Sequence, residues 1–419
     1  MTVSAASQKA SLAIGQRSLG DPSQLFPLQP ALLMGCPVSS TAEMQYPLDI
    51  DYAYDKLDLS LFDQGALAGL DRWAPLLPPL APGISLGEGG TPLIQADKLA
   101  REIGFDGELL LKDESRNPTW SHKDRLNLCT VSAAKLGGAR GIAAASSGNH
   151  GAAAAAYAAR VGLPCVVVTS PGAQPAFRQF LHNLGAHLVI VPTERRWPVL
   201  NRLIEQTGFF PVSNLTRYHT GNPFGPEGYK TIAYELFLQL GRRVPGTVMI
   251  PTGYGELLYG VAKGFAELKR LGLTDRMPRI ASAEPEARGP LARALRSNAA
   301  AMEVEAAPTI AAGIACTVSS FRGVEAIRLS NGRAMTCSDD GLIDLRSKLA
   351  HMGLYQELSG SAGLAALQAG LRRGERFEGP VVAILTSSGL KDLRAETDGV
   401  PFADEAGLEA LIDQLGRKA

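Results

Sequence analysis

The stretch NPTWSHKDRLN at residues 117–127 places Lys123 directly after a histidine and before an aspartate–arginine pair. A lysine can be a surface charge, one member of an ion pair, or a nucleophile whose neutral amine attacks a carbonyl carbon. The third role requires a cleft whose loops suit a phosphate, an aromatic ring and a carboxylate. Three loops elsewhere in the chain have such features, and they make Lys123 a candidate for Schiff-base chemistry.

The first loop, SSGNHG at residues 146–151, follows one apolar run and precedes an alanine-rich run. Small residues at the start of a helix leave backbone N–H groups free to bind an anion. The predicted substrate-binding residues here are Ser146, Ser147, Gly148 and His150, and Asn149 could donate to a ring hydroxyl. The alternative is an ordinary helix N-cap made by the serine and asparagine side chains.

The second loop, PTGYGELLYG at residues 251–260, also joins an apolar run to a helical one. Glycine permits the close backbone approach that a bound phosphate needs. Neither the nucleoside-triphosphate pattern nor the complete dinucleotide pattern is present. The candidate phosphate-binding residues are Gly253, Tyr254, Gly255, Glu256 and Leu257. A tight strand–helix turn without a ligand is the alternative.

The third loop, LTSSGLKD at residues 385–392, follows another strongly apolar run. Thr386 or Ser388 could place a hydroxyl against a pyridine nitrogen. A hydroxyl, unlike a carboxylate, does not strongly favour the protonated ring, so it suits elimination or replacement better than transamination. A helix N-cap is the alternative here as well.

Apolar runs of strand length alternate with runs of helical length along most of the chain. The predicted strands are 109–113, 141–147, 164–170, 187–192, 247–252, 279–285 and 381–388. The predicted helices are 126–137, 150–162, 175–185, 229–241 and 257–272, and several close on glycine. This alternation predicts an α/β fold with a parallel sheet covered on both faces. Ligands of such sheets bind beyond the carboxyl ends of the strands, where Lys123 and the three loops lie.

The composition narrows the class of protein. The 419 residues are 45% hydrophobic, and 41 basic residues balance 41 acidic ones, so a nucleic-acid partner is not expected. The five cysteines lack the spacing of a zinc or disulfide framework, and no metal site is predicted. No apolar run approaches the ~20 residues that cross a bilayer. The first twenty residues make a poor signal peptide, so we expect a cytoplasmic protein.

Several longer motifs resemble those of the fold-type II, tryptophan synthase β-like, pyridoxal-phosphate enzymes, and most of all the threonine synthase family. They are LGEGGTPLI at 86–94, KDESRNPT at 112–119, SHKDR at 121–125 and EGYKTIAYE at 227–235, besides the three loops. The resemblance implies pyridoxal 5'-phosphate as cofactor, held by Lys123 as a Schiff base, with Lys123 also moving protons. It implies that Asn149 contacts the ring hydroxyl of the cofactor, that Thr386 contacts the pyridine nitrogen, and that residues 253–257 bind the phosphate. It also implies that residues 146–148 bind the substrate carboxylate. Asp124 and Arg125 are assigned to orienting and anchoring.

The resemblance also implies two domains and a homodimer. A small domain at residues 126–213 would be inserted into a large cofactor-binding domain made of 46–125 and 214–419. Residues 1–45, rich in serine, proline and glycine, are interpreted as an N-terminal extension.

The chain departs from the family pattern in two places. Where the family usually reads Pro-Thr-Gly-Ser-Phe-Lys-Asp-Arg, this chain has Trp120 for the glycine and His122 for the phenylalanine. We expect a packed, hydrogen-bonded His122. Trp120 would fill space near the cofactor or flank the substrate entrance, and it is grouped with Ser121 among the substrate-binding candidates.

The second departure concerns charge. The family usually carries an arginine, suited to a substrate phosphate, in the segment where this chain has Gly225. Arg217 and Lys230 are near in sequence and could compensate. Glu256 places an acid in a loop expected to bind an anion, so we expect its side chain to point away.

Three functions remain open from the sequence. The first is threonine synthase-like chemistry, in which O-phosphohomoserine yields threonine and phosphate. The second is β-replacement or β-elimination on a serine-, phosphoserine- or cysteine-like substrate, as in cysteate synthase or the dehydratases. The third is a non-catalytic relative that keeps the fold as a binding module.

Overall fold

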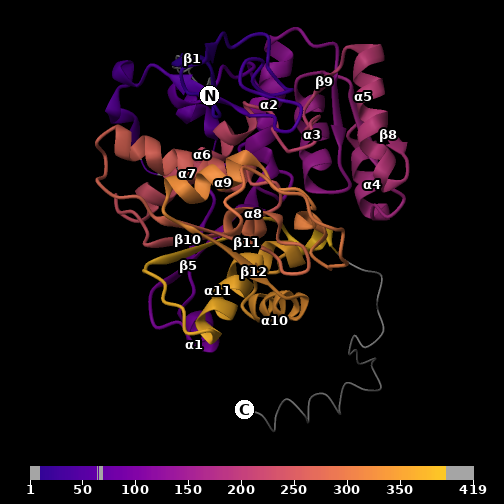
Figure 1. Ribbon diagram of the computed structural model, residues 1–419. Coiled ribbons are helices and arrows are strands. Elements are labelled where there is room, and N and C mark those ends of the chain that lie inside the picture. The colour runs from indigo at the N-terminus through magenta and orange to yellow at the C-terminus, as the bar shows by residue number, and fades with distance from the viewer. Residues whose placement is uncertain (1–9, 64, 66–68, 393–419) are drawn as a thin grey trace, which may run out of the picture.

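The computed structural model describes residues 10–63, 65 and 69–392 (Figure 1). Its largest sheet has six strands in the order β12 (Arg333–Cys337), β11 (Arg279–Pro285), β10 (Thr247–Pro251), β13 (Val381–Leu385), β5 (Leu109–Asp113) and β4 (Leu93–Gln95). Neighbouring strands are parallel except at the edge, where β4 runs antiparallel to β5. A second sheet has four parallel strands in the order β8 (His187–Ile190), β7 (Cys165–Thr169), β6 (Ile142–Ala145) and β9 (Phe210–Pro211).

Helices flank both of these sheets. They are α1 (Asp97–Ile103), α2 (Lys123–Leu136), α3 (Asn149–Arg160), α4 (Pro175–Asn183), α5 (Arg196–Thr207), α6 (Gly225–Gln239), α7 (Glu256–Arg270), α8 (Pro290–Arg296), α9 (Phe321–Leu329), α10 (Asp339–Ala350) and α11 (Ala362–Arg372). In Figure 1, α6, α7 and α9 lie on one side of the larger sheet, and α1, α10 and α11 lie on the other. Within β10, Val248 and Ile250 join one apolar cluster while Met249 joins the other. The α/β class with parallel sheets is thus confirmed, and the continuous apolar strands reflect burial on both faces.

All seven strands predicted from apolar runs are present, and the five predicted helices are also present. Four of these helices start earlier than predicted: α3 and α7 by one residue, and α2 and α6 by more, at Lys123 and Gly225. The edge strand β12 and the short β4 and β9 had no comparable apolar run and were not predicted. Among the described residues, no helix is long and apolar enough to span a membrane.

The N-terminal segment pairs with residues beyond its predicted boundary. Strand β1 (Ala13–Ser18) lies between β2 (Leu25–Phe26) and β3 (Leu48–Tyr52) in an antiparallel sheet. Residues 13–26 of the predicted extension are therefore built into the same sheet as residues 48–52. The strands of the four-stranded sheet all lie between residues 142 and 211. We keep the division into a large domain and an inserted small domain at residues 126–213 as a proposal.

Candidate active site

Loops from the carboxyl ends of both parallel sheets line one cavity of about 740 Å³. The predicted site residues that line it are Trp120, Lys123, Ser146, Ser147, Gly148, Asn149, His150, Gly253, Tyr254, Gly255, Glu256, Leu257 and Thr386. Ser121 is fully buried and is not among the lining residues. Its hydroxyl instead accepts a hydrogen bond from the backbone N–H of Lys123 at 3.4 Å, so Ser121 helps to hold the backbone of the lysine. The roles of the other residues toward ligands stay predictions.

Lys123 is the first residue of α2, and its amine faces the cavity. Among the described residues, Nζ has no hydrogen bond or ion pair, and the ring of Tyr229 lies 5.5 Å away. Burial lowers the pKa of Lys123, while the charges of Glu256, Cys316 and Glu357 oppose that shift. A lowered pKa increases the neutral fraction of the amine, which is the form that attacks a carbonyl carbon.

His122 is packed and hydrogen-bonded beside the lysine. Its Nδ1 lies 3.1 Å from the carbonyl oxygen of Thr386, which also accepts the His122 backbone N–H at 3.0 Å. The imidazole stacks on Tyr229 with ring centroids 5.4 Å apart. Burial and then the charge of Lys123 hold the pKa of His122 well below its usual range. The ring is therefore neutral, and it links the lysine turn to the Thr386 loop.

The loop after β6 is held by its own side chains and by a carboxylate. The Ser146 hydroxyl accepts the Gly151 N–H at 2.9 Å, as an ordinary cap would. Asn149 donates from Nδ2 to Glu357 Oε2 at 2.9 Å and accepts the Ser387 hydroxyl at 3.1 Å on Oδ1. Burial raises the pKa of Glu357. Asn149 is thus fixed in the cavity wall with one amide hydrogen left for a ligand.

The loop after β10 requires glycine at Gly255. Its φ is +87°, and a Cβ there would lie 2.9 Å from the Gly323 Cα. The loop runs directly into α7, so backbone N–H groups of the first helical turn face the cavity end. Three features of the cavity fit pyridoxal phosphate. The unpartnered Lys123 amine suits its aldehyde, and the glycine turn at the start of α7 suits its phosphate. The Thr386 hydroxyl suits its ring nitrogen.

Glu256 is the exception to this fit. Its carboxylate lies beside Gly221 and His219 on the cavity wall, where a Cβ on Gly221 would be 2.3 Å from Oε1. Burial alone would raise the pKa of Glu256, but the electrostatic interactions with His219 and then Lys123 lower it. The carboxylate is thus turned toward the 219–221 segment, and its charge still reaches the lysine.

Besides His122, two further buried histidines contribute to a pH dependence of stability. Burial lowers the pKa of His150 and of His219 from 6.5 to about 4. Between these values the unfolded chain binds protons that these folded imidazoles exclude, so their contribution to stability falls on acidification. Asp124 and Glu284, whose pKa values burial raises to about 7, contribute in the opposite direction. We expect each imidazole to contribute a fall of about 1.4 kcal/mol per pH unit to the free energy of unfolding, measured in urea between pH 6.5 and 4.5.

His219→Phe, which keeps the ring stacked on Tyr254 at 4.2 Å, should reduce the slope of this fall with pH. The exposed His187 supplies the matched control, and His187→Gln should leave the slope unchanged. A slope that is the same in His219→Phe and in the unaltered protein would contradict this account.

Trp120 lies at the rim of the cavity in a backbone conformation that tryptophan rarely adopts. Its φ is +58°, its side chain is 48% exposed, and its ring lies 5.8 Å from that of Phe180 on α4. The backbone is held there because the Trp120 carbonyl accepts the Ser388 N–H and the Ser387 hydroxyl, each at 3.1 Å. Trp120 therefore lines an exposed part of the cavity, and the prediction that its indole flanks the substrate entrance stays a prediction.

Substituting Trp120 should separate backbone strain from the loss of the indole. Trp120→Gly relieves the left-handed conformation and Trp120→Ala does not, so the glycine variant should be the more stable by about 1 kcal/mol in urea unfolding. Both variants open the entrance equally, and both should accept bulkier amino acids. Equal stability of the two variants would show that residue 120 is unstrained.

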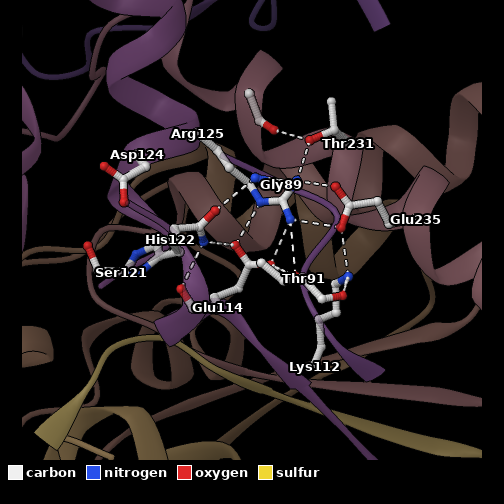
Figure 2. A network of polar contacts seen from close by, with 12 residues as sticks. Gly89, Thr91, Lys112, Glu114, Ser121, His122, Asp124, Arg125, Thr231 and Glu235 are labelled. Carbon is white, nitrogen blue, oxygen red and sulfur yellow. Dashed lines mark hydrogen bonds and ion pairs between the residues drawn. The ribbon is translucent and has the colours of Figure 1, made fainter. Parts of the chain in front are cut away.

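A buried ionic network anchors the start of α2 (Figure 2). Arg125 donates from Nε to Glu114 Oε2 at 2.7 Å and from Nη1 to Glu235 Oε1 at 2.6 Å. Glu235 also accepts Lys112 Nζ at 2.7 Å, and all four side chains are almost fully buried. Burial alone would raise the pKa of Glu235, but Arg125 and then Lys112 lower it to about 2. The network joins β5, α2 and α6, and it fixes Lys123 two residues away.

Gly225, where the family has an arginine, does not line the cavity, and neither do Arg217 and Lys230, the two residues proposed to compensate for it. Gly225 is buried, and a Cβ there would meet Leu126 at 3.1 Å. The Arg217 side chain is 66% exposed and paired with Glu303. Lys230 is buried in ion pairs with Glu227 and Glu267, at 2.7 and 2.9 Å. The suggestion that Arg217 or Lys230 compensates is therefore wrong.

Several cavity residues were not found from the sequence. They are Phe177, Phe180, Arg196, Trp197, His219, Cys316, Glu357 and Lys391. Lys391 belongs to the third predicted loop but was given no role, and no signal in the sequence assigned the others to the site.

The family model described as "Pyridoxal-phosphate dependent enzyme" matches residues 84–387. The chain is 31% identical over 385 residues to the threonine synthase of Methanosarcina acetivorans, covering 89% of this chain and 93% of that protein. It is 33% identical to the threonine synthase of Halalkalibacterium halodurans, over 74% of this chain and 85% of the relative.

Solved structures with the same fold include two enzymes. The T.th. threonine deaminase matches with a TM-score of 0.61 and 26% identity, covering 75% of this chain and 94% of that one. Maize serine racemase matches with a TM-score of 0.62 and 21% identity, covering 78% of this chain and 93% of that one.

Proposed function

Because the chain belongs to the family of pyridoxal-phosphate-dependent enzymes, we propose that it is a lyase acting on an amino acid that carries a leaving group. The first candidate reaction converts O-phosphohomoserine and water into threonine and phosphate, as the names of the threonine synthase relatives suggest. The observation that carries the proposal is the unpartnered amine of Lys123 in the cavity that the three loops share.

Pyridoxal phosphate, once bound, supplies an electron sink that stabilises negative charge at the substrate Cα. Lys123 would hold it covalently through Nζ, and the backbone after Gly255 would bind its phosphate. Thr386 would present a hydroxyl to the ring nitrogen, and Asn149 would donate its free amide hydrogen to the ring hydroxyl. A hydroxyl partner leaves the ring nitrogen largely unprotonated, which favours elimination or replacement over transamination.

Lys123 is also the group that would move protons. Its lowered pKa suits an amine that takes a proton from Cα and returns one later in the reaction. His122 stays neutral with Nδ1–H donated to a carbonyl, so it orients the lysine turn and does not compete for that proton. Ser147, Gly148 and the start of α3 would bind the substrate carboxylate.

A second candidate is β-replacement or β-elimination on a shorter substrate such as O-phosphoserine or serine. It is favoured by the position of Gly225, which is buried behind Leu126 and lines no part of the cavity. A non-catalytic role is disfavoured by the free amine of Lys123. We also retain the proposals of a homodimer and of an inserted small domain.

The test is to incubate the yellow holoenzyme separately with O-phosphohomoserine, O-phosphoserine, serine and threonine, and to measure phosphate and amino-acid products. Phosphate and threonine formed from O-phosphohomoserine alone would establish the first candidate. Products from a three-carbon substrate alone would establish the second. A colourless protein that turns over none of them would overturn both.

A further inference from the structure

We propose that Arg196 recognises a second anionic group on the substrate side chain, distinct from the α-carboxylate. The proposal rests on the proposed function, because it assigns a residue that selects among the substrates of that cavity. The substrate class is then an amino acid whose side chain carries a phosphate or another anion of similar shape.

Arg196 brings an uncompensated positive charge to the cavity. It is the first residue of α5, it is partly buried, and it lines the cavity from the side of the four-stranded sheet. Its Nη1 donates to the Ser147 hydroxyl at 3.2 Å and its Nε to the Thr193 carbonyl at 3.3 Å. Within the part of the chain that the structure describes, Arg196 forms no ion pair. Since a guanidinium has five N–H donors, several remain for a ligand.

The other cations at the cavity have different partners. Lys123 is assigned to the cofactor. Lys391 donates from Nζ to the Thr119 carbonyl at 2.6 Å, and the charges of Glu357 and Asp124 lie near it. Arg217 and Lys230 lie elsewhere, as described above. Arg196 is therefore the remaining cation in the described lining with charge and donors to offer an anion.

Local structure does not account for an arginine at this position. The start of a helix carries partial positive charge, which favours acidic residues and disfavours basic ones. Here Arg196 is the first residue of α5, directly after a 3-10 helix at Thr193–Arg195 that carries Glu194, and it forms no ion pair with that residue. A basic residue near a helix start that lines a cavity and keeps unused donors indicates a binding role. The planar guanidinium can form two parallel hydrogen bonds to a phosphate or carboxylate.

The Ser147 contact places the guanidinium next to the loop predicted to bind the α-carboxylate. Arg196 could therefore act on either anion, and the two cases differ in which ligands they affect. If Arg196 binds the side-chain anion, its substitution weakens the binding only of ligands that carry such an anion. If Arg196 binds the α-carboxylate, its substitution weakens the binding of every amino acid equally.

The experiment measures dissociation constants from the change in the visible spectrum of the holoenzyme. The ligands form two matched pairs, O-phosphohomoserine with homoserine and O-phosphoserine with serine. We expect Arg196→Gln to weaken whichever phosphorylated ligands the unaltered protein binds by about 10- to 100-fold, the range for a charge-assisted hydrogen bond, and to leave the neutral partners within about 3-fold. Arg196→Lys should recover part of the loss.

Arg195→Gln is the matched control, because Arg195 is the adjacent, exposed arginine and lines no part of the cavity. Equal weakening of phosphorylated and neutral ligands by Arg196→Gln would overturn the proposal, and so would no weakening of either. If Arg196→Gln selectively weakens the phosphorylated ligands but the holoenzyme releases no phosphate from them, Arg196 keeps this role while the proposed lyase reaction fails.

Discussion

Replacing Lys123 by alanine is expected to abolish the yellow colour of the purified holoenzyme and to lower kcat/KM by about 10²- to 10⁴-fold or more. Both effects have one physical cause. The amine is the group positioned to bind the cofactor covalently, and it has no other hydrogen-bond or ion-pair partner among the described residues. The same amine is positioned to move the proton at Cα. The visible spectrum and the rate of phosphate or product release measure the two effects separately.

Lys391→Ala is the matched control for that prediction. Lys391 also lines the cavity, and burial lowers its pKa to about 8, so it is a second amine that could compete for the cofactor. Its Nζ is already bonded to the Thr119 carbonyl, and we expect the colour to survive its removal. Colour that persists in Lys123→Ala and disappears in Lys391→Ala would transfer the role to Lys391.

Arg125→Met is expected to have the largest effect on stability, a loss of about 3–5 kcal/mol in the free energy of unfolding. The substitution leaves Glu114 without its ionic partner and Glu235 with Lys112 alone, and both carboxylates are buried. An unpaired buried carboxylate has lost its hydration without regaining an equivalent interaction. Urea unfolding at pH 7 measures the change.

Arg217→Ala supplies the comparison for a solvent-exposed pair. Its partner Glu303 is 50% exposed, and such pairs contribute about 0–1 kcal/mol. Because Arg217 lies away from the cavity, this variant should also retain full activity. A loss in Arg125→Met no larger than that in Arg217→Ala would mean that the buried network does not hold α2 in place.

The strands and the three loops could be predicted from the sequence because their signals are local. A continuous apolar run followed by glycine or small polar residues and then a helical run predicts where a parallel strand ends and what binds there. The loops after β6 and β10 follow this rule, the loop after β13 shares its small polar residues, and all three meet at one cavity. The resemblance of the motifs added the identity of the cofactor.

The remaining site residues could not be predicted because sequence distance says little about distance in space. Lys230 is close to Gly225 in the sequence, but α6 is buried on nearly all sides, and Lys230 pairs with Glu227 and Glu267 away from the cavity. Arg196 and Glu357, by contrast, are far from Lys123 in the sequence and line the same cavity. Their positions follow from the packing of α5 and of the turn before α11.

The backbone conformation of Trp120 could not be predicted from the sequence either. Only glycine commonly signals a positive φ, and tryptophan at this position gave no such sign. The sequence showed that a family glycine was missing, and the structure shows that the indole in its place lies beside Phe180 in the cavity lining.

The most direct test of the central claim is to reduce the yellow holoenzyme with borohydride, digest it, and locate the cofactor by peptide mass spectrometry. Reduction fixes the cofactor to the amine that holds it. The account predicts the pyridoxyl group on Lys123, in the peptide that contains SHKDR. A pyridoxyl group on Lys391, or on no lysine at all, would contradict it.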